Sequence, residues 1–255
     1  MTDQVLVAAL DGILIITLNR PEARNAATLA IAQGVAAALD ELDQRSDLHA
    51  AVITGAGGTF CSGMDLKAFL RGERPRIEGR GFAGLTEKPP QKPLIAAVEG
   101  YALAGGFEIV LACDLVVAAD DAQFGLPEVK RGLVATAGGL VRLPRQLPQR
   151  LAMEMALTGN MISAARLYES GLLNRVVPTG QALDEALALA RTIADNGPLA
   201  TRTSKRIIME SADWPTDELF ARQRVLSDPV FQSPDAQEGA AAFAEKRKPV
   251  WNRQA

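Results

Sequence analysis

The chain has 255 residues, of which 48% are hydrophobic, and its formal net charge is −3. It is long enough to bury a sizeable core, its acidic balance argues against nucleic acid as a partner, and no apolar run reaches the roughly 18–20 residues of a membrane helix. One histidine and two cysteines argue against a metal site and a disulfide framework, and with a first segment unlike a signal peptide they predict a cytoplasmic setting.

The first half of the chain alternates short apolar runs with helical patterns. In chain order we predict strands over Val5–Leu10 and Ile13–Leu18, a helix over 28–42, strands over 50–54 and 94–99, a helix over 106–112, and strands over 114–119 and Gln123–Gly125. Asp11 and Gly12 join the first two strands and are typical of a hairpin turn. Thr28 is the expected N-cap of the first helix, and His49 is expected at a strand edge. This alternation predicts a mixed or parallel sheet with crossover helices.

Two regions break this alternation. Residues 71–92 hold several arginines, glutamates and prolines with little periodicity, which predicts a mobile surface segment that could act as a lid. After Pro148 the pattern is helical throughout, with helices expected over 182–194, 199–209 and 234–246. These C-terminal helices could complete the core or dock on a neighbouring subunit.

Two glycine-rich turns carry candidate chemistry. Gly105 and Gly106 stand between an apolar strand and a helix, and Ser62, Gly63 and Met64 precede another short helix. Glycine lets backbone N–H groups approach a ligand closely, and a helix N-terminus adds positive partial charge. Either turn alone is more often a tight connection without a ligand. The two together make an oxyanion hole more plausible than either does singly.

Two glutamates, Glu108 and Glu128, lie 20 positions apart, each in a glycine-containing frame. Each is by itself an ordinary helix-start carboxylate. If they face one cavity, the pair can move protons while the oxyanion hole holds a negatively charged oxygen. His49 is the single histidine, which argues against a Ser-His-Asp triad. The chain has no GxGxxG after a strand and no GxxxxGK[ST], so no nicotinamide or flavin is predicted.

Taken in order, these motifs resemble the enoyl-CoA hydratase/isomerase family, the crotonase superfamily. The resemblance covers nearly the whole chain through residues 18–26, 60–69, 92–139 and 241–248. It implies an α/β fold with a spiral core of repeated ββα units over 1–195, followed by a helical trimerisation region over 196–255. It also implies a homotrimer or hexamer, an acyl-CoA thioester as substrate, and a lyase of fatty acid metabolism. No separate cofactor is implied, because coenzyme A is part of the substrate.

The resemblance also implies roles for individual residues. The two backbone N–H groups that stabilise the thioester enolate match Met64 and Gly105. Glu108 and Glu128 match the glutamates that hold the catalytic water, with Glu108 expected as the base and Glu128 as the acid. The residues expected to contact CoA or substrate are Ala23, Arg24, Cys61, Ser62, Gly63, Asp65, Leu66, Lys67 and Thr136, with Phe243 and Lys246 from a helix that can cover CoA bound to a neighbour. Candidate acyl-pocket side chains are Met64, Phe69, Leu126, Thr136 and Leu140.

The leading hypothesis is a 2-enoyl-CoA hydratase that converts a trans-2-enoyl-CoA to a 3-hydroxyacyl-CoA. Residues 135–139 lack the Pro-Gly that is common in the family, so Thr136 stands where a glycine N–H often helps to position the water. Residues 142–148 are similar to carnitinyl-CoA dehydratase-like members, which keep the same glutamate pair. That activity, enoyl-CoA isomerisation and a non-catalytic acyl-CoA-binding protein are the alternatives. RNA binding, known for rare relatives, is opposed by the acidic balance.

Overall fold

A six-stranded sheet forms the centre of the fold, which a computed structural model describes for residues 3–251. Its strands in spatial order are β1 (Val5–Leu10), β2 (Ile13–Leu18), β3 (Ala50–Gly55), β6 (Leu94–Val98), β8 (Leu115–Ala119) and β11 (Arg175–Val177). β1 and β2 are antiparallel, and the remaining neighbours in this sheet are parallel. The predicted hairpin is confirmed, because Leu10 pairs with Ile13 across a turn in which Asp11 and Gly12 have positive φ.

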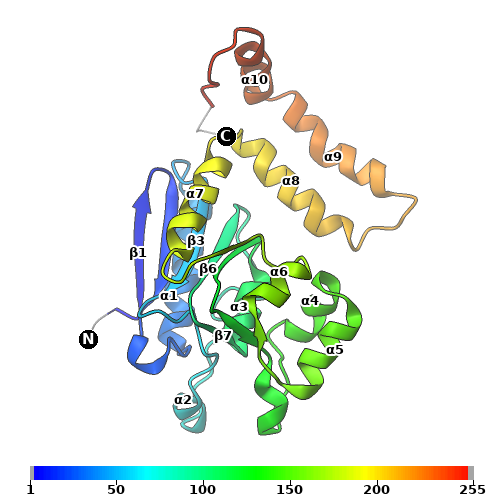
Figure 1. The fold of residues 1–255 in the computed structure, drawn as a ribbon. Helices are drawn as coiled ribbons and strands as arrows, with labels where there is room; N and C mark the ends of the chain where they lie inside the picture. The colour runs from blue at the N-terminus through cyan, green and yellow to red at the C-terminus, as the bar shows by residue number, and fades with distance from the viewer. Residues whose placement is uncertain (1–2, 252–255) are drawn as a thin grey trace.

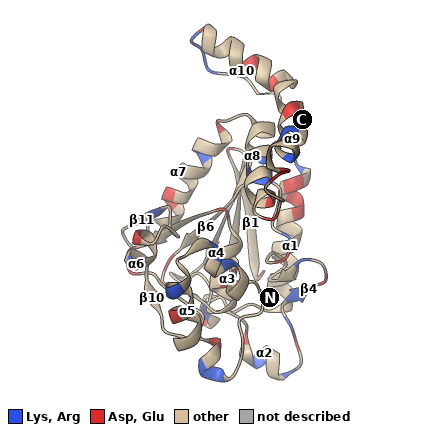
Figure 2. Ribbon diagram, turned by 90° about the vertical axis from the view of Figure 1, so that its right-hand side faces the viewer, with Lys and Arg blue, Asp and Glu red and all other residues tan. Residues whose placement is uncertain are grey.

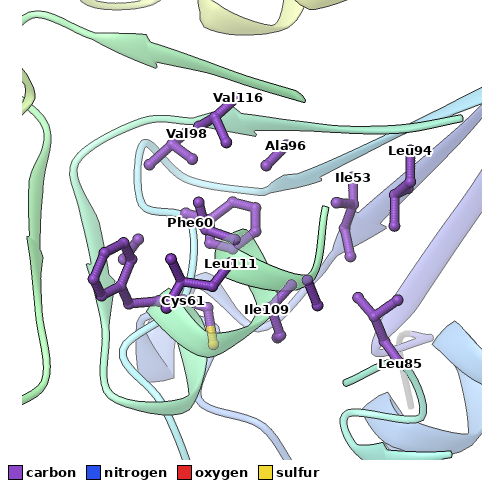
Figure 3. Close-up of a cluster of buried hydrophobic side chains, with 14 of the residues drawn as sticks. Ile53, Phe60, Cys61, Leu85, Leu94, Ala96, Val98, Ile109, Leu111 and Val116 are labelled. Atoms are coloured by element: carbon purple, nitrogen blue, oxygen red, sulfur yellow. The ribbon is translucent and has the colours of Figure 1, made fainter. Parts of the chain in front are cut away.

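Helices cover both faces of the large sheet (Figure 1). One face packs on α1 (Leu29–Gln44) and α3 (Gly105–Ala112), and the other packs on α7 (Ala182–Ala194). Thr28 is the N-cap of α1, as predicted, and its hydroxyl accepts a bond from Ile31 N. Successive strand residues point to opposite faces, so Ile53 joins the cluster that surrounds α3 in Figure 3 while Val52 packs beneath α7. Both faces of the central strands are therefore buried, whereas β1 at the edge of the sheet is largely exposed.

A smaller sheet lies beside the first and completes the repeat. It contains β7 (Tyr101–Leu103), β9 (Gln123–Gly125) and β10 (Ile162–Ser163). The chain passes from β6 to β7 to α3, and then from β8 to β9 and on to the 3₁₀ helix η2 (Pro127–Arg131) and α4 (Gly139–Gln146). This confirms the expected ββα spiral. Because β7 and β9 are parallel neighbours, the segments that carry Glu108 and Glu128 start from the same edge of this sheet.

Two predictions about the middle of the chain are wrong. The region after 148 is not helical throughout, because β10 and β11 interrupt α5 (Gln149–Thr158), α6 (Ala164–Glu169) and α7. β11 has three residues and gains its hydrogen bonds only by pairing with β8, so it carries little sequence periodicity of its own. The segment 71–92 is not a surface segment throughout either. The short strands β4 (Arg76–Ile77) and β5 (Gly81–Phe82) lie in this segment. Within residues 81–86, Ala83 and Leu85 are completely buried.

The C-terminal helices extend away from the sheet as an arm (Figure 1). They are α8 (Pro198–Ser211), α9 (Leu219–Phe231) and α10 (Pro234–Ala244), and neither α8 nor α9 has a fully buried residue. Acidic and basic residues are interspersed over α8 and α9 (Figure 2). Lys205 of α8 reaches the core, where its ammonium pairs with Asp114 at 2.6 Å. The division at 195/196 falls between α7 and α8 and stays a prediction. Within 3–251, no helix is long and apolar enough to cross a membrane.

Candidate active site

The segment that carries Met64 is held by bonds to residues 20–27. Ala27 N donates to Gly63 O at 2.7 Å, and Asp65 N donates to Ala27 O at 3.0 Å. The N–H of Met64, between these two bonds, takes no part in the pairing. The Asp65 carboxylate caps α2 (Leu66–Leu70) and pairs with the Arg20 guanidinium at 3.1 Å, with both side chains largely buried. Both Asp65 oxygens are therefore engaged within the chain, where they fix the loop that carries Met64.

Gly105 begins α3 directly beside this loop. A Cβ added to Gly63 would lie 3.3 Å from Gly105 N, so the two glycine turns are in contact. Ala104 precedes Gly105 with φ of 51°, a conformation that is costly for a residue with a side chain and that sets the sharp entry into α3. Among the hydrogen bonds of residues 3–251, neither Met64 N nor Gly105 N is a donor. The structure thus brings together two available N–H groups, as an oxyanion hole requires.

The ring of Phe82 lies against Gly105. A Cβ added to Gly105 would fall 2.4 Å from that ring, so only glycine fits without displacement. Gly106 is equally confined, because its Cβ would fall 2.1 Å from Cys61 O. Phe82 is not among the site residues predicted from the sequence. Its one local signal is an aromatic residue directly after Gly81 in a segment otherwise rich in charge.

Glu108 is buried, with an exposed fraction of 3%. It lies in the first turn of α3, as predicted, and its Oε1 accepts bonds from Ala137 N at 2.7 Å and Gly139 N at 2.8 Å. Burial raises the pKa of this carboxyl, while the two N–H donors and the positive charge of Arg142 act in the opposite direction. Glu108 therefore has partners that favour its ionised form despite its burial.

Glu128 lies in the first turn of η2 in a different environment. Its Oε2 is buried and has no hydrogen-bond partner in the described part of the chain. Burial raises the pKa of Glu128 from 4.5 to about 7, and the negative charge of Glu108 acts in the same direction. The two carboxyls therefore interact, and their surroundings favour a proton on Glu128 rather than on Glu108. Such a difference is typical of an acid and a base that share one site.

The raised pKa of Glu128 predicts a pH-dependent stability. Folded protein keeps this proton up to about pH 7, whereas the unfolded chain loses it near pH 4.5, so unfolding releases a proton between these values. The free energy of unfolding should fall by about 1–3 kcal/mol through this group as pH rises from 4.5 to 8. Urea unfolding at several pH values should show a shallower decline for Glu128→Gln than for wild type. Equal slopes would contradict the prediction.

An apolar cavity of about 440 Å³ opens beside Glu128, between η2, α4 and α5. It is lined by Leu126, Glu128, Val129, Val134, Ala135, Leu140, Leu143, Pro144, Gln149, Ala152, Met153, Ala156 and Leu157. Glu128 is the one charged residue of this lining. Of the five predicted pocket residues, Leu126 and Leu140 line the cavity, whereas Met64, Phe69 and Thr136 do not. The contribution of α5 to the cavity was not predicted from the sequence. The spacing of apolar residues marks the buried face of a helix but not the element against which that face packs.

The residues expected to bind CoA fall into two groups. Ala23, Arg24, Ser62, Gly63, Leu66 and Lys67 lie along the paired segments 20–27 and 62–67, where Ser62 N donates to Arg24 O at 3.0 Å. Arg24 is exposed, and its guanidinium lies 5.9 Å from the centre of the Tyr101 ring. Cys61 differs from the rest of this group. Its side chain is fully buried and thus not available for the contact expected of it.

Three further expected residues are exposed. Thr136 lies next to Ala137, whose N–H binds Glu108. Phe243 is 88% exposed near the end of α10, and Lys246 follows it. Figure 1 places α10 at the opposite end of the molecule from α2. A single chain therefore does not bring Phe243 or Lys246 to its own CoA segments.

Comparison with known proteins places these features in a family. The family model described as enoyl-CoA hydratase/isomerase matches residues 9–254. This chain belongs to the enoyl-CoA hydratase/isomerase family. It is 44% identical over 247 residues to enoyl-CoA hydratase EchA19 of Mycobacterium tuberculosis, covering 92% of this chain and 91% of that protein. It is 43% identical to the carnitinyl-CoA dehydratase of Salmonella enteritidis, covering 94% of each.

A solved structure gives the same result for the fold. The crystal structure of an enoyl-CoA hydratase from Mycobacterium tuberculosis H37Rv superimposes with a TM-score of 0.97 at 58% identity, covering 98% of this chain and 99% of that one. The crotonase-like fold predicted from the motifs is thus confirmed, and the chain is an enzyme of this family. The relatives carry more than one substrate in their names, so the substrate of this chain must be argued from its own site.

Proposed function

We propose that this protein is a 2-enoyl-CoA hydratase that adds water across the C2–C3 double bond of a trans-2-enoyl-CoA. The observation that supports this most directly is the contrast between the two glutamates. Glu108 accepts two N–H bonds at one oxygen, whereas Glu128 has a buried oxygen without a partner and a raised pKa. One carboxylate that stays ionised and one that keeps its proton supply a base and an acid for the addition of water.

In the proposed reaction, the thioester carbonyl oxygen accepts hydrogen bonds from Met64 N and Gly105 N. These bonds withdraw electrons from the double bond and make C3 electrophilic. Water between the glutamates attacks C3 as Glu108 takes one of its protons, and the enolate oxygen is stabilised by the two N–H groups. Glu128 then gives its proton to C2. A proton passed from Glu108 back to Glu128 restores the pair, so the net change is addition of one water.

The apolar cavity favours a hydrocarbon acyl group over a carnitinyl group. Apart from Glu128, its lining offers one polar side chain, Gln149, and no aromatic ring to face a quaternary ammonium ion. Carnitinyl-CoA dehydration is nevertheless the second candidate, because a 43% identical relative carries that name. Kinetics with crotonyl-CoA, trans-2-octenoyl-CoA and crotonobetainyl-CoA test the choice. We expect kcat/KM for octenoyl-CoA to exceed that for crotonobetainyl-CoA by about tenfold or more. The reverse order would favour the second candidate, and binding without turnover would favour an acyl-CoA-binding protein.

Filling the cavity should shorten the range of accepted acyl chains. Ala156 of α5 lines the cavity and is half-buried, so Ala156→Phe should reduce its volume without disturbing the deep core. We expect kcat/KM for octenoyl-CoA to fall about tenfold or more and that for crotonyl-CoA to change less than about threefold. Glu154→Phe, which adds the same ring on the exposed face of α5, is the control. An equal loss with both substrates would show that the acyl chain lies elsewhere.

The C-terminal arm supports a further part of the proposal, a homotrimer or a dimer of trimers. α8 and α9 leave large apolar side chains in solvent, among them Phe220, Val225 and Phe231 at 72–79% exposure. Apolar surface of this kind is usually covered by a partner. Phe243 and Lys246 are then proposed to contact CoA bound to a neighbouring subunit. Because the chemistry uses only side chains, N–H groups and the thioester, we propose that no separate cofactor takes part.

A further inference from the structure

Arg142 joins two parts of the site that are far apart in the sequence. It lies in the first turn of α4 and is half-buried, and its Nη2 donates to the carbonyl oxygen of Thr86 at 2.7 Å. Thr86 is 1% exposed and belongs to the buried segment 81–86. The guanidinium therefore connects α4 to that segment through a partly buried hydrogen bond.

One end of this connection is the turn that holds Glu108. The guanidinium of Arg142 lies directly over Gly138, where an added Cβ would fall 2.2 Å from Nη1. Gly138 has φ of 107° and stands between Ala137 and Gly139, whose N–H groups both bind Glu108. A side chain that packs on Gly138 restricts the conformation of this turn. The position of both donors to Glu108 thus depends on Arg142.

The other end of the connection is the oxyanion hole. Thr86 N donates to Phe82 O at 3.2 Å, and the Phe82 ring packs on Gly105. Arg142 is thus linked, through one backbone segment, to the residue that covers one of the two N–H donors. It also acts electrostatically, because its positive charge favours the ionised form of Glu108.

We infer that Arg142 is a positioning residue, which holds the turn that carries the donors to Glu108 against the segment that carries Phe82. The expected effects on the reaction rate rest on the proposed hydratase function. The contacts of Arg142 with Thr86 and Gly138 do not depend on it. In this role the guanidinium contributes a planar group that can bond Thr86 O while packing over Gly138. A lysine keeps the charge but lacks this fork, so charge and geometry can be separated.

The test compares Arg142→Gln, Arg142→Lys and the control Arg145→Gln, which removes an exposed arginine of the same helix. We expect Arg142→Gln to lower kcat for crotonyl-CoA about 10–100-fold with KM changed less than threefold. The acid limb of its pH–rate profile should move to higher pH, because Glu108 loses a favourable charge and its pKa rises. Arg142→Lys keeps the positive charge, so the acid limb of its pH–rate profile should lie at the wild-type pH. Its kcat should stay as low as that of Arg142→Gln. Arg145→Gln should match wild type in both.

A second readout does not depend on turnover. The pKa of Glu108 can be measured by NMR with ¹³C-labelled glutamate in a Glu128→Gln background, with and without Arg142→Gln. We expect a higher pKa for Glu108 when Arg142 is absent. If wild type hydrates no enoyl-CoA, the proposed function fails. The inference then stands if the pKa of Glu108 rises in Arg142→Gln and the backbone amide signals of Ala137 and Gly139 shift in both Arg142→Gln and Arg142→Lys. The inference is overturned if a folded Arg142→Gln keeps the wild-type rate and pH profile, or if its pKa of Glu108 is unchanged.

Discussion

Replacing Glu128 by glutamine is expected to lower kcat for hydration of crotonyl-CoA by about 10²–10⁴-fold, with little change in KM. Glutamine has the size of the protonated glutamate but has no proton of suitable acidity to give to C2. The buried Oε2 of Glu128 has no partner in the described chain, so the substitution breaks no hydrogen bond there. The rate is followed by the loss of the enoyl-thioester absorbance for wild type and variant side by side.

The companion and control variants show whether the loss belongs to the pair. Glu108→Gln should lose a similar factor, since its amide oxygen can still accept the bonds from Ala137 N and Gly139 N but cannot take a proton from water. Glu154→Gln, on the exposed face of α5, removes a carboxylate outside the site and should leave kcat unchanged. Near-normal turnover in either Glu108→Gln or Glu128→Gln would contradict the mechanism with two carboxylates.

Gly105→Pro is expected to lower kcat by a further 10²–10³-fold, roughly, relative to Gly105→Ala. Gly105 is the first residue of α3, a position where proline is tolerated because its N–H has no partner within the helix. Proline therefore removes one proposed donor to the enolate oxygen while the helix can still form. Both variants are assayed for hydration of crotonyl-CoA.

The alanine variant accounts for the steric part of this change. An added Cβ falls 2.4 Å from the Phe82 ring in both variants, so the ring must move in each. The difference between the two rates therefore excludes the displacement of Phe82. It contains the loss of the N–H group and the strain that proline adds at Ala104, whose φ is 51°. If Gly105→Ala and Gly105→Pro have equal kcat, Gly105 N does not stabilise the transition state. Circular dichroism of both variants checks that α3 is retained.

Local patterns were sufficient for much of the framework. The hairpin at Asp11 and Gly12, the N-cap at Thr28 and the start of α3 near Gly105 follow from turn, capping and helix preferences that act over a few residues. The same preferences place Glu108 and Glu128 in the first turns of their helices. The ordered motifs are also sufficient to identify the family.

The proximity of Glu108 and Glu128, in contrast, does not follow from local sequence preferences. It requires β7 and β9 to pair in parallel, so that the helices after them start from one edge. That pairing is a long-range choice, and no local spacing specifies it. For the same reason, the sequence alone indicated neither the different surroundings of the two carboxyls nor the apolar cavity beside Glu128.

What the sequence by itself determined was therefore the family, the elements with strong local signals and the candidate chemical groups, because these depend on neighbouring residues along the chain. The tertiary structure alone decided which groups meet. Residues 81–86 are buried, although they belong to the charge-rich segment 71–92, because Ala83 and Leu85 pack into the core. β11 exists because β8 offers an unpaired edge. Arg142 reaches Thr86 across 56 positions, and only packing of the whole chain can create such a contact.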